Sequence, residues 1–286
     1  MLKQLSYLGF RLLAGLFWLM PIWMAYGFSN FLAFVLYRVW GYRKAVVMDN
    51  LRKSFPEKSE AEIKSIAKKY YNHLAKLAVE VLKMSSLSKE YFIQNIRIEG
   101  VEILEQLKDR KTFMLCGHTG NWEWAALMFG IVCPQGFNTS YKPVSNPFFE
   151  AWFKKVRTRF GNIALPMTLM PRELMGNKRP SVTGLVADQN PSSMDNLWLQ
   201  FLNRETLFFS GVERLAKKLD VAVVFADMYR TGNGQYRIHL ELMTEHANTL
   251  PDGHLMQDYV TRLEKAIYLH PENWLWSHRR WKHKRA

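Results

Sequence analysis

The segment MLCGHTGNWEW contains two residues that could move a proton, His118 and Glu123. His118 follows the apolar run TFMLCG (112–117), which has the pattern of a buried strand. In one straight helix, a spacing of five residues would turn the two side chains about 140° apart, which excludes a helical metal site of the HExxH kind. They can meet if His118 lies in a turn that Gly120 tightens, with Glu123 in the first turn of the following helix.

Such a pair has the chemistry of a general base. Glu123 would accept a hydrogen bond from one imidazole nitrogen, fix the tautomer and stabilise the imidazolium. The other nitrogen of His118 would then take a proton from a hydroxyl group. A structural interpretation stays open, because a carboxylate in the first turn of a helix is stabilised by the helix dipole and a His beside it can act as a cap.

A second apolar segment, SVTGLVAD (181–188), also ends in an ionisable residue, Asp188. In open α/β sheets, functional sites form beyond the carboxyl ends of strands, so we expect Asp188 and His118 to face one crevice. Further strands are predicted at 221–229 and 235–242, and helices from Ser59 or Glu60 to about residue 84 and at 146–161, 210–219 and 255–271. This alternation predicts an α/β sandwich with a parallel or mixed sheet.

The N-terminal part has the composition of a membrane anchor. No residue between Leu12 and Tyr37 is charged, and this run exceeds the roughly 20 residues that span a bilayer. Pro21 favours a kinked helix or two half-helices in the interface over one straight span, and a buried core helix is the alternative. We expect residues 1–45 to form the anchor and residues 46–286 an α/β catalytic domain.

The charge and cysteine content narrow the function further. The net charge is +14 and the pI about 9.7, which favours an anionic partner. No nucleic-acid-binding module is recognisable, so we expect no nucleic acid partner. The two cysteines form no CxxC pair, in keeping with a reducing compartment. Basic residues are more frequent after the apolar run than before it, which places the catalytic domain on the cytoplasmic face.

Five segments together resemble one enzyme family. HTGNWE resembles the H-x4-D/E motif of glycerolipid acyltransferases, and more closely the H-x-G-N-W-E form in the bacterial lipid A biosynthesis acyltransferases, the late lauroyl and myristoyl transferases. The other four segments are similar to the remaining motifs of that family and extend over nearly the whole chain: YRKAVVMDNLRKSFPEKSEAE, RTRFGN, ADQNP and PENWLWSHRRWK.

This resemblance implies acyl transfer at the inner membrane, from an acyl thioester to a hydroxyl of a lipid A precursor. The donor would be acyl carrier protein, with coenzyme A as the alternative, and no metal or cofactor is needed because a thioester is already activated. The implied catalytic residues are His118 as general base, Glu123 as its orienting partner, Arg159 and Asp188. Substrate-binding residues are expected in the same motifs and in the basic tail: Asn121, Arg157, Gln189 and Arg279.

Several alternatives stay open at this level. Arg157 lies close enough to Arg159 to take its role, and ADQNP lacks the second acidic residue of many relatives, which affects acceptor preference. The acceptor could instead be a lysophospholipid or an aminolipid. A membrane-anchored binding protein without activity, or a metal-dependent hydrolase sensitive to chelators, are rivals from other classes.

Overall fold

The computed structural model describes residues 2–191, 193–194 and 196–285. Its centre is a seven-stranded sheet in the order β1-β9-β8-β2-β5-β3-β4. β8 and β9 pair antiparallel, and the other neighbours in this sheet pair in parallel, so the prediction of a mixed sheet is confirmed. The strands are β1 (Ile96–Glu99), β2 (Lys111–Cys116), β3 (Phe137–Tyr141), β4 (Ile163–Pro166), β5 (Ser181–Val186), β8 (Ala222–Gly232) and β9 (Gln235–Thr244).

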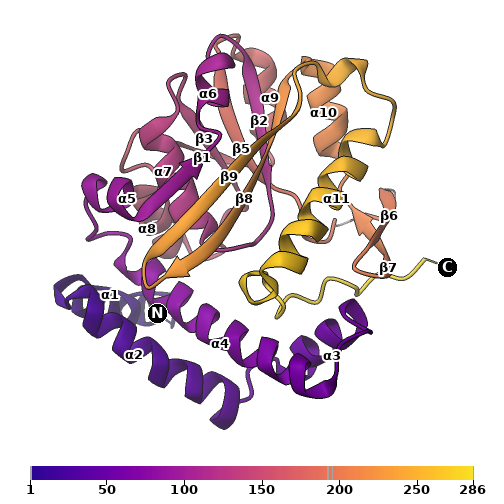
Figure 1. Cartoon of the computed structure of the whole chain (residues 1–286). Coiled ribbons are helices and arrows are strands. Elements are labelled where there is room, and N and C mark those ends of the chain that lie inside the picture. Colours follow the sequence, from indigo (N-terminus) through magenta and orange to yellow (C-terminus); the bar gives the residue numbers. More distant parts are fainter. Residues whose placement is uncertain (1, 192, 195, 286) are drawn as a thin grey trace.

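Helices cover both faces of this sheet (Figure 1). One face carries α5 (Lys89–Asn95), α6 (Glu102–Gln106), α7 (Trp122–Val132) and α8 (Pro147–Arg157). The other carries α9 (Met170–Gly176), α10 (Gly211–Leu219), α11 (His254–Leu269) and a hairpin of β6 (Leu197–Phe201) and β7 (Arg204–Phe208). The predicted helix at 146–161 ends earlier, at Arg157, because a turn follows in which Gly161 has a φ of +91°.

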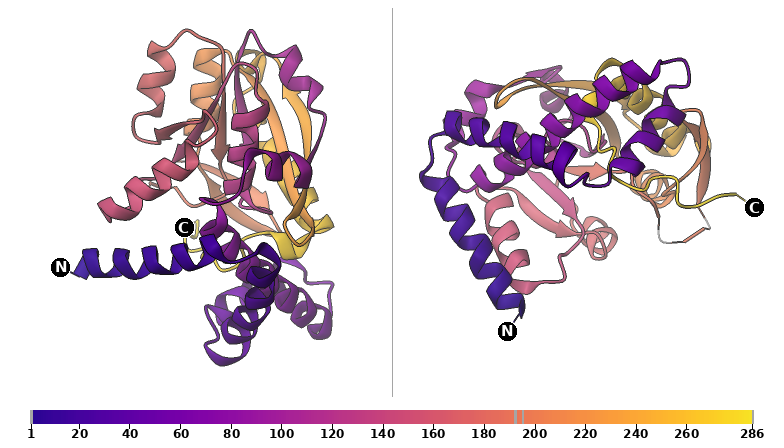
Figure 2. Two further views of the ribbon diagram at one scale, coloured as in Figure 1. Left: turned by 90° about the vertical axis from the view of Figure 1, so that its left-hand side faces the viewer. Right: turned by 90° about the horizontal axis from the view of Figure 1, so that it is seen from below.

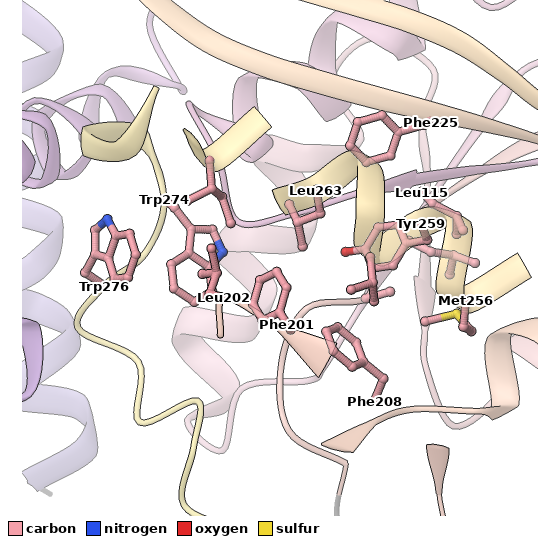
Figure 3. Packing of buried hydrophobic residues seen from close by; sticks show 14 of the residues in the cluster. Leu115, Phe201, Leu202, Phe208, Phe225, Met256, Tyr259, Leu263, Trp274 and Trp276 are labelled. Atoms are coloured by element: carbon pink, nitrogen blue, oxygen red, sulfur yellow. The ribbon is translucent and has the colours of Figure 1, made fainter. Parts of the chain in front are cut away.

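Alternating side chains of the strands supply the two cores. On β2, Phe113 and Leu115 belong to the core beneath α11, and Met114 belongs to the core on the opposite face. Figure 3 shows Leu115 beside Tyr259 of α11. A strand with both faces buried reads as a continuous apolar run, which is why TFMLCG shows no alternation in the sequence.

The N-terminal apolar run is divided between two helices. α1 (Leu2–Leu19) ends just before Pro21, and α2 (Ile22–Phe34) continues through a short π-helical segment, η1 (Val35–Val39). The break agrees with the broken form of the anchor expected from the sequence, because proline cannot donate a hydrogen bond within a helix. Lys83 of α4 holds the end of α1 in place by donating hydrogen bonds to the carbonyls of Phe17, Trp18 and Met20.

α2 exposes large apolar side chains. Among the described residues, Ile22–Val39 is the one helical stretch long and apolar enough to cross a membrane, judged by length and composition. Trp23 and Phe31 on its outer side are 73% and 62% exposed, whereas the small residues Ala25 and Ser29 are buried on the inner side. A buried core helix would not leave Trp and Phe in water, so that alternative is excluded.

Two further helices connect the apolar region to the sheet. α3 (Lys44–Ser54) spans the predicted boundary at residue 45. α4 (Glu60–Lys83) begins where the sequence predicted, and a capping box of Ser59 and Glu62 closes its first turn. α2 packs along α4, and both lie below the sheet in Figure 1. α1 extends from this layer beneath α8 (Figure 2), where aromatic rings of the two helices are in contact.

Candidate active site

His118 and Asp188 are joined by the parallel pairing of β2 and β5. The last pair in register is Cys116 with Val186, and each of the two functional residues lies two positions further along its strand. The Nδ1 atom of His118 lies 2.5 Å from Oδ1 of Asp188, and the backbone N–H of His118 donates to Oδ2 at 2.8 Å. The carboxyl ends of adjacent parallel strands thus place the base and the carboxylate side by side.

The partners of His118 determine its tautomer. An ionised Asp188 only accepts hydrogen bonds, so Nδ1 of His118 carries the hydrogen and Nε2 has a free lone pair. The exposed side-chain amide of Gln189 donates to this Nε2 at 3.0 Å. A substrate hydroxyl that replaced this amide would meet a nitrogen ready to accept its proton.

Asp188 is held ionised although its side chain is only 2% exposed. Burial alone would raise the pKa of this carboxyl, but attraction to His118 when its ring is protonated, hydrogen bonds from His118 and a bond from Trp274 lower the pKa to about 2. The indole N–H of Trp274 donates to Oδ2 at 2.8 Å. Such a carboxylate stabilises an imidazolium without taking its proton.

Glu123 does not make the bond to His118 that the spacing suggested. It lies in the first turn of α7, as expected, but both of its carboxylate oxygens accept from the guanidinium of Arg157 on α8, at 2.5 and 2.8 Å. The two side chains are each 12% exposed. A bidentate pair of this kind occupies both carboxylate oxygens of Glu123, so Glu123 links α7 to α8. The carboxylate beside the imidazole is that of Asp188.

Of the two neighbouring arginines, the structure brings Arg157 to the motif. Arg159 points elsewhere: its guanidinium donates to the carbonyl of Met84 and lies 5.1 Å from the ring centre of Phe160. The expected role of Arg159 at the reacting carbonyl therefore has no support in this geometry. Arg157 uses its Nε and one Nη to bind Glu123. These two donors are therefore not free for the substrate contact that was expected of Arg157.

The turn after His118 depends on Gly120 and Asn121. Gly120 has a φ of +56°, and a Cβ atom there would lie 2.6 Å from the carbonyl oxygen of Met228, so only glycine fits. Asn121 caps α7 by accepting from the N–H of Trp124 at 3.0 Å. The side chain of Asn121 is fully buried and also donates to Glu80, so this geometry supports a role in positioning the turn and gives no support to the expected contact with substrate.

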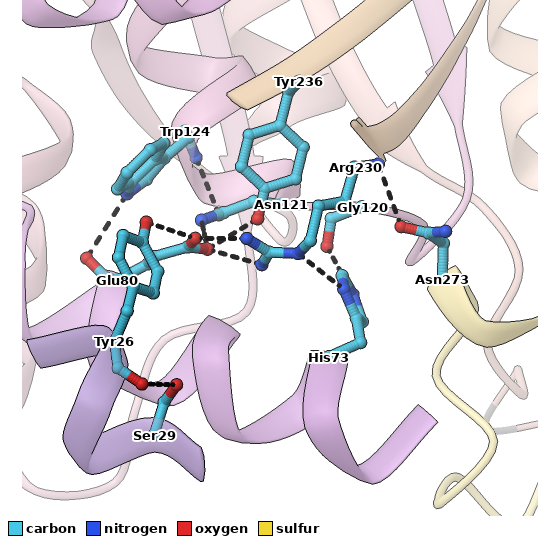
Figure 4. Close-up of polar contacts among 10 residues, drawn as sticks. All are labelled: Tyr26, Ser29, His73, Glu80, Gly120, Asn121, Trp124, Arg230, Tyr236 and Asn273. Carbon is cyan, nitrogen blue, oxygen red and sulfur yellow. Dashed lines mark hydrogen bonds and ion pairs between the residues drawn. The ribbon is translucent and has the colours of Figure 1, made fainter. Parts of the chain in front are cut away.

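A buried polar network lies beneath this turn (Figure 4). At its centre, Glu80 of α4 is 1% exposed and accepts both ends of the Arg230 guanidinium, at 2.5 and 2.8 Å. The same carboxylate accepts from Tyr236 of β9, from Tyr26 of α2 and from Asn121, at 2.6 to 2.9 Å. Five donors satisfy one buried charge, and they connect the apolar helix α2 to the cap of α7.

His73 extends this network along α4. Its Nε2 donates to the carbonyl of Gly120 at 3.1 Å, and its Nδ1 accepts from Nε of Arg230 at 3.2 Å. Burial, and then the charge of Arg230, lowers the pKa of His73 to about 3, so the ring is neutral at physiological pH. The backbone of Arg230 donates in turn to Asn273, which holds the C-terminal segment next to the same turn.

The C-terminal motif, PENWLWSHRRWK (271–282), forms one wall of the pocket at His118. Trp274 and His278 line this shallow, narrow pocket. Arg279, expected to bind substrate, is exposed, whereas the next residue, Arg280, is buried. Arg280 donates to Asn190 and to the carbonyl of Leu207, and it fixes the segment that follows Asp188. The positioning role of Arg280 and the bond from Trp274 to Asp188 were not predicted from the sequence, although both residues lie in the motif PENWLWSHRRWK.

Two other kinds of chemistry find no basis among the described residues. Burial, and next the charge of Asp188, raises the pKa of the Cys116 thiol to about 12, so this cysteine is not a thiolate nucleophile at neutral pH. In residues 2–191, 193–194 and 196–285, no group of three or more His, Cys, Asp or Glu could hold a metal ion.

A comparison with protein families decides the class of enzyme. The family described as bacterial lipid A biosynthesis acyltransferase matches residues 2–283, nearly the whole chain. The chain belongs to this family. A search of curated proteins returns no match. Membership makes the protein an acyltransferase, with an acyl donor and a lipid acceptor, and the apolar helix α2 agrees with a membrane-associated family.

Proposed function

We propose that this acyltransferase moves an acyl chain from acyl carrier protein to a hydroxyl of a lipid A precursor at the inner membrane. In this proposal residues 1–45 anchor the protein and residues 46–286 act on the cytoplasmic face. The observation that carries the chemistry is the pair of His118 and Asp188, in which Nδ1 faces the carboxylate and Nε2 faces the exposed amide of Gln189. Acyl-coenzyme A is the alternative donor.

The reaction needs one base and no covalent enzyme intermediate. Nε2 of His118 takes the proton of the acceptor hydroxyl while its oxygen attacks the thioester carbonyl, and the new C–O bond forms as the carbonyl becomes an oxyanion. The oxyanion collapses, the C–S bond breaks, and the thiolate leaves with the proton that the imidazolium returns. Asp188 stabilises the imidazolium through both steps.

Two residues support substrate binding in this proposal. The amide of Gln189, which now donates to Nε2 of His118, is positioned to donate to the carbonyl oxygen once a substrate hydroxyl takes its place. The backbone N–H groups of His118 and Gly120 already donate to Asp188 and to Asn273, so they are not open to the oxyanion. Arg279 is exposed beside the site and suits a phosphate of the acceptor or the acidic surface of the carrier protein.

The test is acyl transfer by full-length protein in detergent, with acyl carrier protein as donor and mass spectrometry of the lipid product. Wild type should add one acyl mass to a tetra-acylated lipid A precursor, and His118→Ala should lower the rate by about 10²–10⁴-fold. The chain offers a matched control, because exposed His246 forms a similar pair with Asp220, at 2.9 Å. His246→Ala should keep the wild-type rate.

Three outcomes would contradict parts of the proposal. If a lysophospholipid or aminolipid is acylated and the lipid A precursor is not, the role of His118 as base stands and the proposed acceptor is wrong. Equal rates for wild type and His118→Ala remove His118 as the base. Tight lipid binding with no transfer from either thioester would make this chain a binding protein that retains the fold.

A further inference from the structure

A cavity of about 630 Å³ lies between η1, α3 and α4, and it shares no lining residue with the pocket at His118. Its wall is strongly basic. Five cationic side chains from three elements line it: Arg38, Lys44, Arg52, Lys64 and Lys68. Small-molecule sites in proteins have volumes of about 300–1,000 Å³, so this cavity has the size of a ligand site.

Most of this positive charge is not neutralised within the protein. Arg52 pairs with Glu60 at 2.6 Å. The ammonium group of Lys44 lies 4.1 Å from the ring centre of Tyr37, which holds it without cancelling its charge. Glu60 also attracts Lys64. Within the described part of the chain, however, the ammonium groups of Lys64 and Lys68 form no hydrogen bond or salt bridge. A set of cations gathered around one cavity repels itself, and an anion in the cavity would relieve that repulsion.

The cavity lies where the apolar helix ends. Arg38 belongs to the last turn of the stretch long enough to cross a membrane, Ile22–Val39. Val39 and Trp40 next to it are 70% and 69% exposed, and a tryptophan at this height is typical of the bilayer interface. Figure 1 shows α3 and the adjoining end of α4 beside this end of the α2 segment. Lipid phosphates lie at the same level of a bilayer.

We propose that this cavity binds the phosphate-bearing headgroup of an anionic membrane lipid. Lysine ammonium groups bind phosphate as point charges, and an anionic leaflet attracts basic residues placed near its surface. An acidic partner protein fits less well, because a stable protein interface covers about 800 Å² on each side, far more than one headgroup-sized cavity offers. The site lies outside the catalytic pocket and its binding needs no turnover, so it goes beyond the proposed reaction.

The test measures lipid binding to the full-length protein in a neutral detergent by native mass spectrometry. Phosphatidic acid and phosphatidylcholine are the probes. The double substitution Lys64→Ala with Lys68→Ala should weaken phosphatidic acid binding by about fivefold for each lysine, and leave phosphatidylcholine binding unchanged. Lys53 of α3, which pairs with Asp49, and Lys69 of α4 are exposed lysines outside the cavity wall. Replacing both with Ala removes the same charge and should leave the preference for phosphatidic acid intact.

Two added arms distinguish other sources of the anion. Inorganic phosphate at the same concentration as the lipid should not displace phosphatidic acid, and displacement would mean that the cavity takes free phosphate. Loss of acyl carrier protein binding in the Lys64, Lys68 double variant, with lipid binding unchanged, would mean that the surface serves a protein. If the Lys53, Lys69 variant loses as much phosphatidic acid binding, the effect comes from net charge and not from the cavity. Each of these results overturns the proposal.

Discussion

His118 and Asp188 occupy the same position on two neighbouring parallel strands, each two residues beyond the register pair of Cys116 and Val186. Their side chains meet at 2.5 Å because parallel strands in register end together. Glu123, five residues from His118, faces Arg157 on another helix. The partner of the imidazole thus comes from a residue 70 positions away in the sequence.

This relationship separates the roles of the two carboxylates. Asp188→Asn keeps the shape but removes the negative charge that supports the imidazolium, so kcat should fall by up to about 10⁴-fold with little change in KM for the acceptor. Glu123→Gln leaves the Arg157 guanidinium with a neutral partner, which should lower the free energy of unfolding by about 3 kcal/mol. Steady-state kinetics and denaturant unfolding of both variants check this.

A double-mutant cycle gives the control for Glu123. If Glu123 acts through Arg157, then adding Arg157→Met to Glu123→Gln should cost little further stability or rate, because the unpaired buried charge is gone. Glu123→Gln and Asp188→Asn should instead have additive effects on log kcat. Additivity between Glu123 and Arg157, with strong coupling between Glu123 and His118, would restore the pairing expected from the sequence.

Breaking the buried ion pair of Glu80 and Arg230 should lower the free energy of unfolding far more than breaking an exposed Glu–Arg pair. Glu80→Gln leaves Arg230 charged and almost fully buried, so unfolding should become easier by about 3–5 kcal/mol. Arg237 and Glu99 form a similar ion pair at 44% and 50% exposure, and Glu99→Gln should cost less than about 1 kcal/mol. Equal costs in chemical denaturation would show that the network contributes no more than a surface pair.

His73 predicts a loss of stability in mild acid. Its pKa is about 3 in the folded protein and about 6.5 when unfolded, so the folded state binds fewer protons in that window and stability falls as pH falls from 6.5 towards 3. The loss from this group should reach about 2 kcal/mol by pH 5. His73→Gln can keep one donor and one acceptor, and it should remove this dependence of stability on pH. His246→Gln on the surface should leave the dependence in place. Urea unfolding at pH 7 and pH 5 measures it.

Gly120 predicts a combined loss of stability and activity. In Gly120→Ala the new Cβ atom would lie 2.6 Å from the carbonyl of Met228 at a φ of +56°, so the turn that holds His118 must move. Gly136 also has a positive φ, but open space surrounds it. Gly136→Ala should therefore cost only the backbone strain, about 1–2 kcal/mol, with full kcat. Similar kcat values for the two variants would show that the turn tolerates displacement.

Local chemistry explains why much of this protein can be predicted from its sequence. The capping box at Ser59 fixes the start of α4, and the break at Pro21 divides the apolar run, because both depend on neighbouring residues alone. His118 at the end of a buried strand and Gly120 in a tight turn are likewise local features. The mixed α/β sheet follows from the alternation of strands and helices, and the family from motifs spread over the whole chain.

Only the tertiary structure decides which charges meet. Asp188, not Glu123, lies beside His118 because the β2–β5 register brings distant residues together, and a spacing of five carries no information about that register. Arg157 reaches Glu123 and Arg159 reaches the carbonyl of Met84, because the packing of α8 against α7 brings only the first arginine to the motif. The sequence thus determines the local turns and the types of reactive group, whereas strand pairing and helix packing select their partners, since a short-range hydrogen bond depends on distance in space and not along the chain.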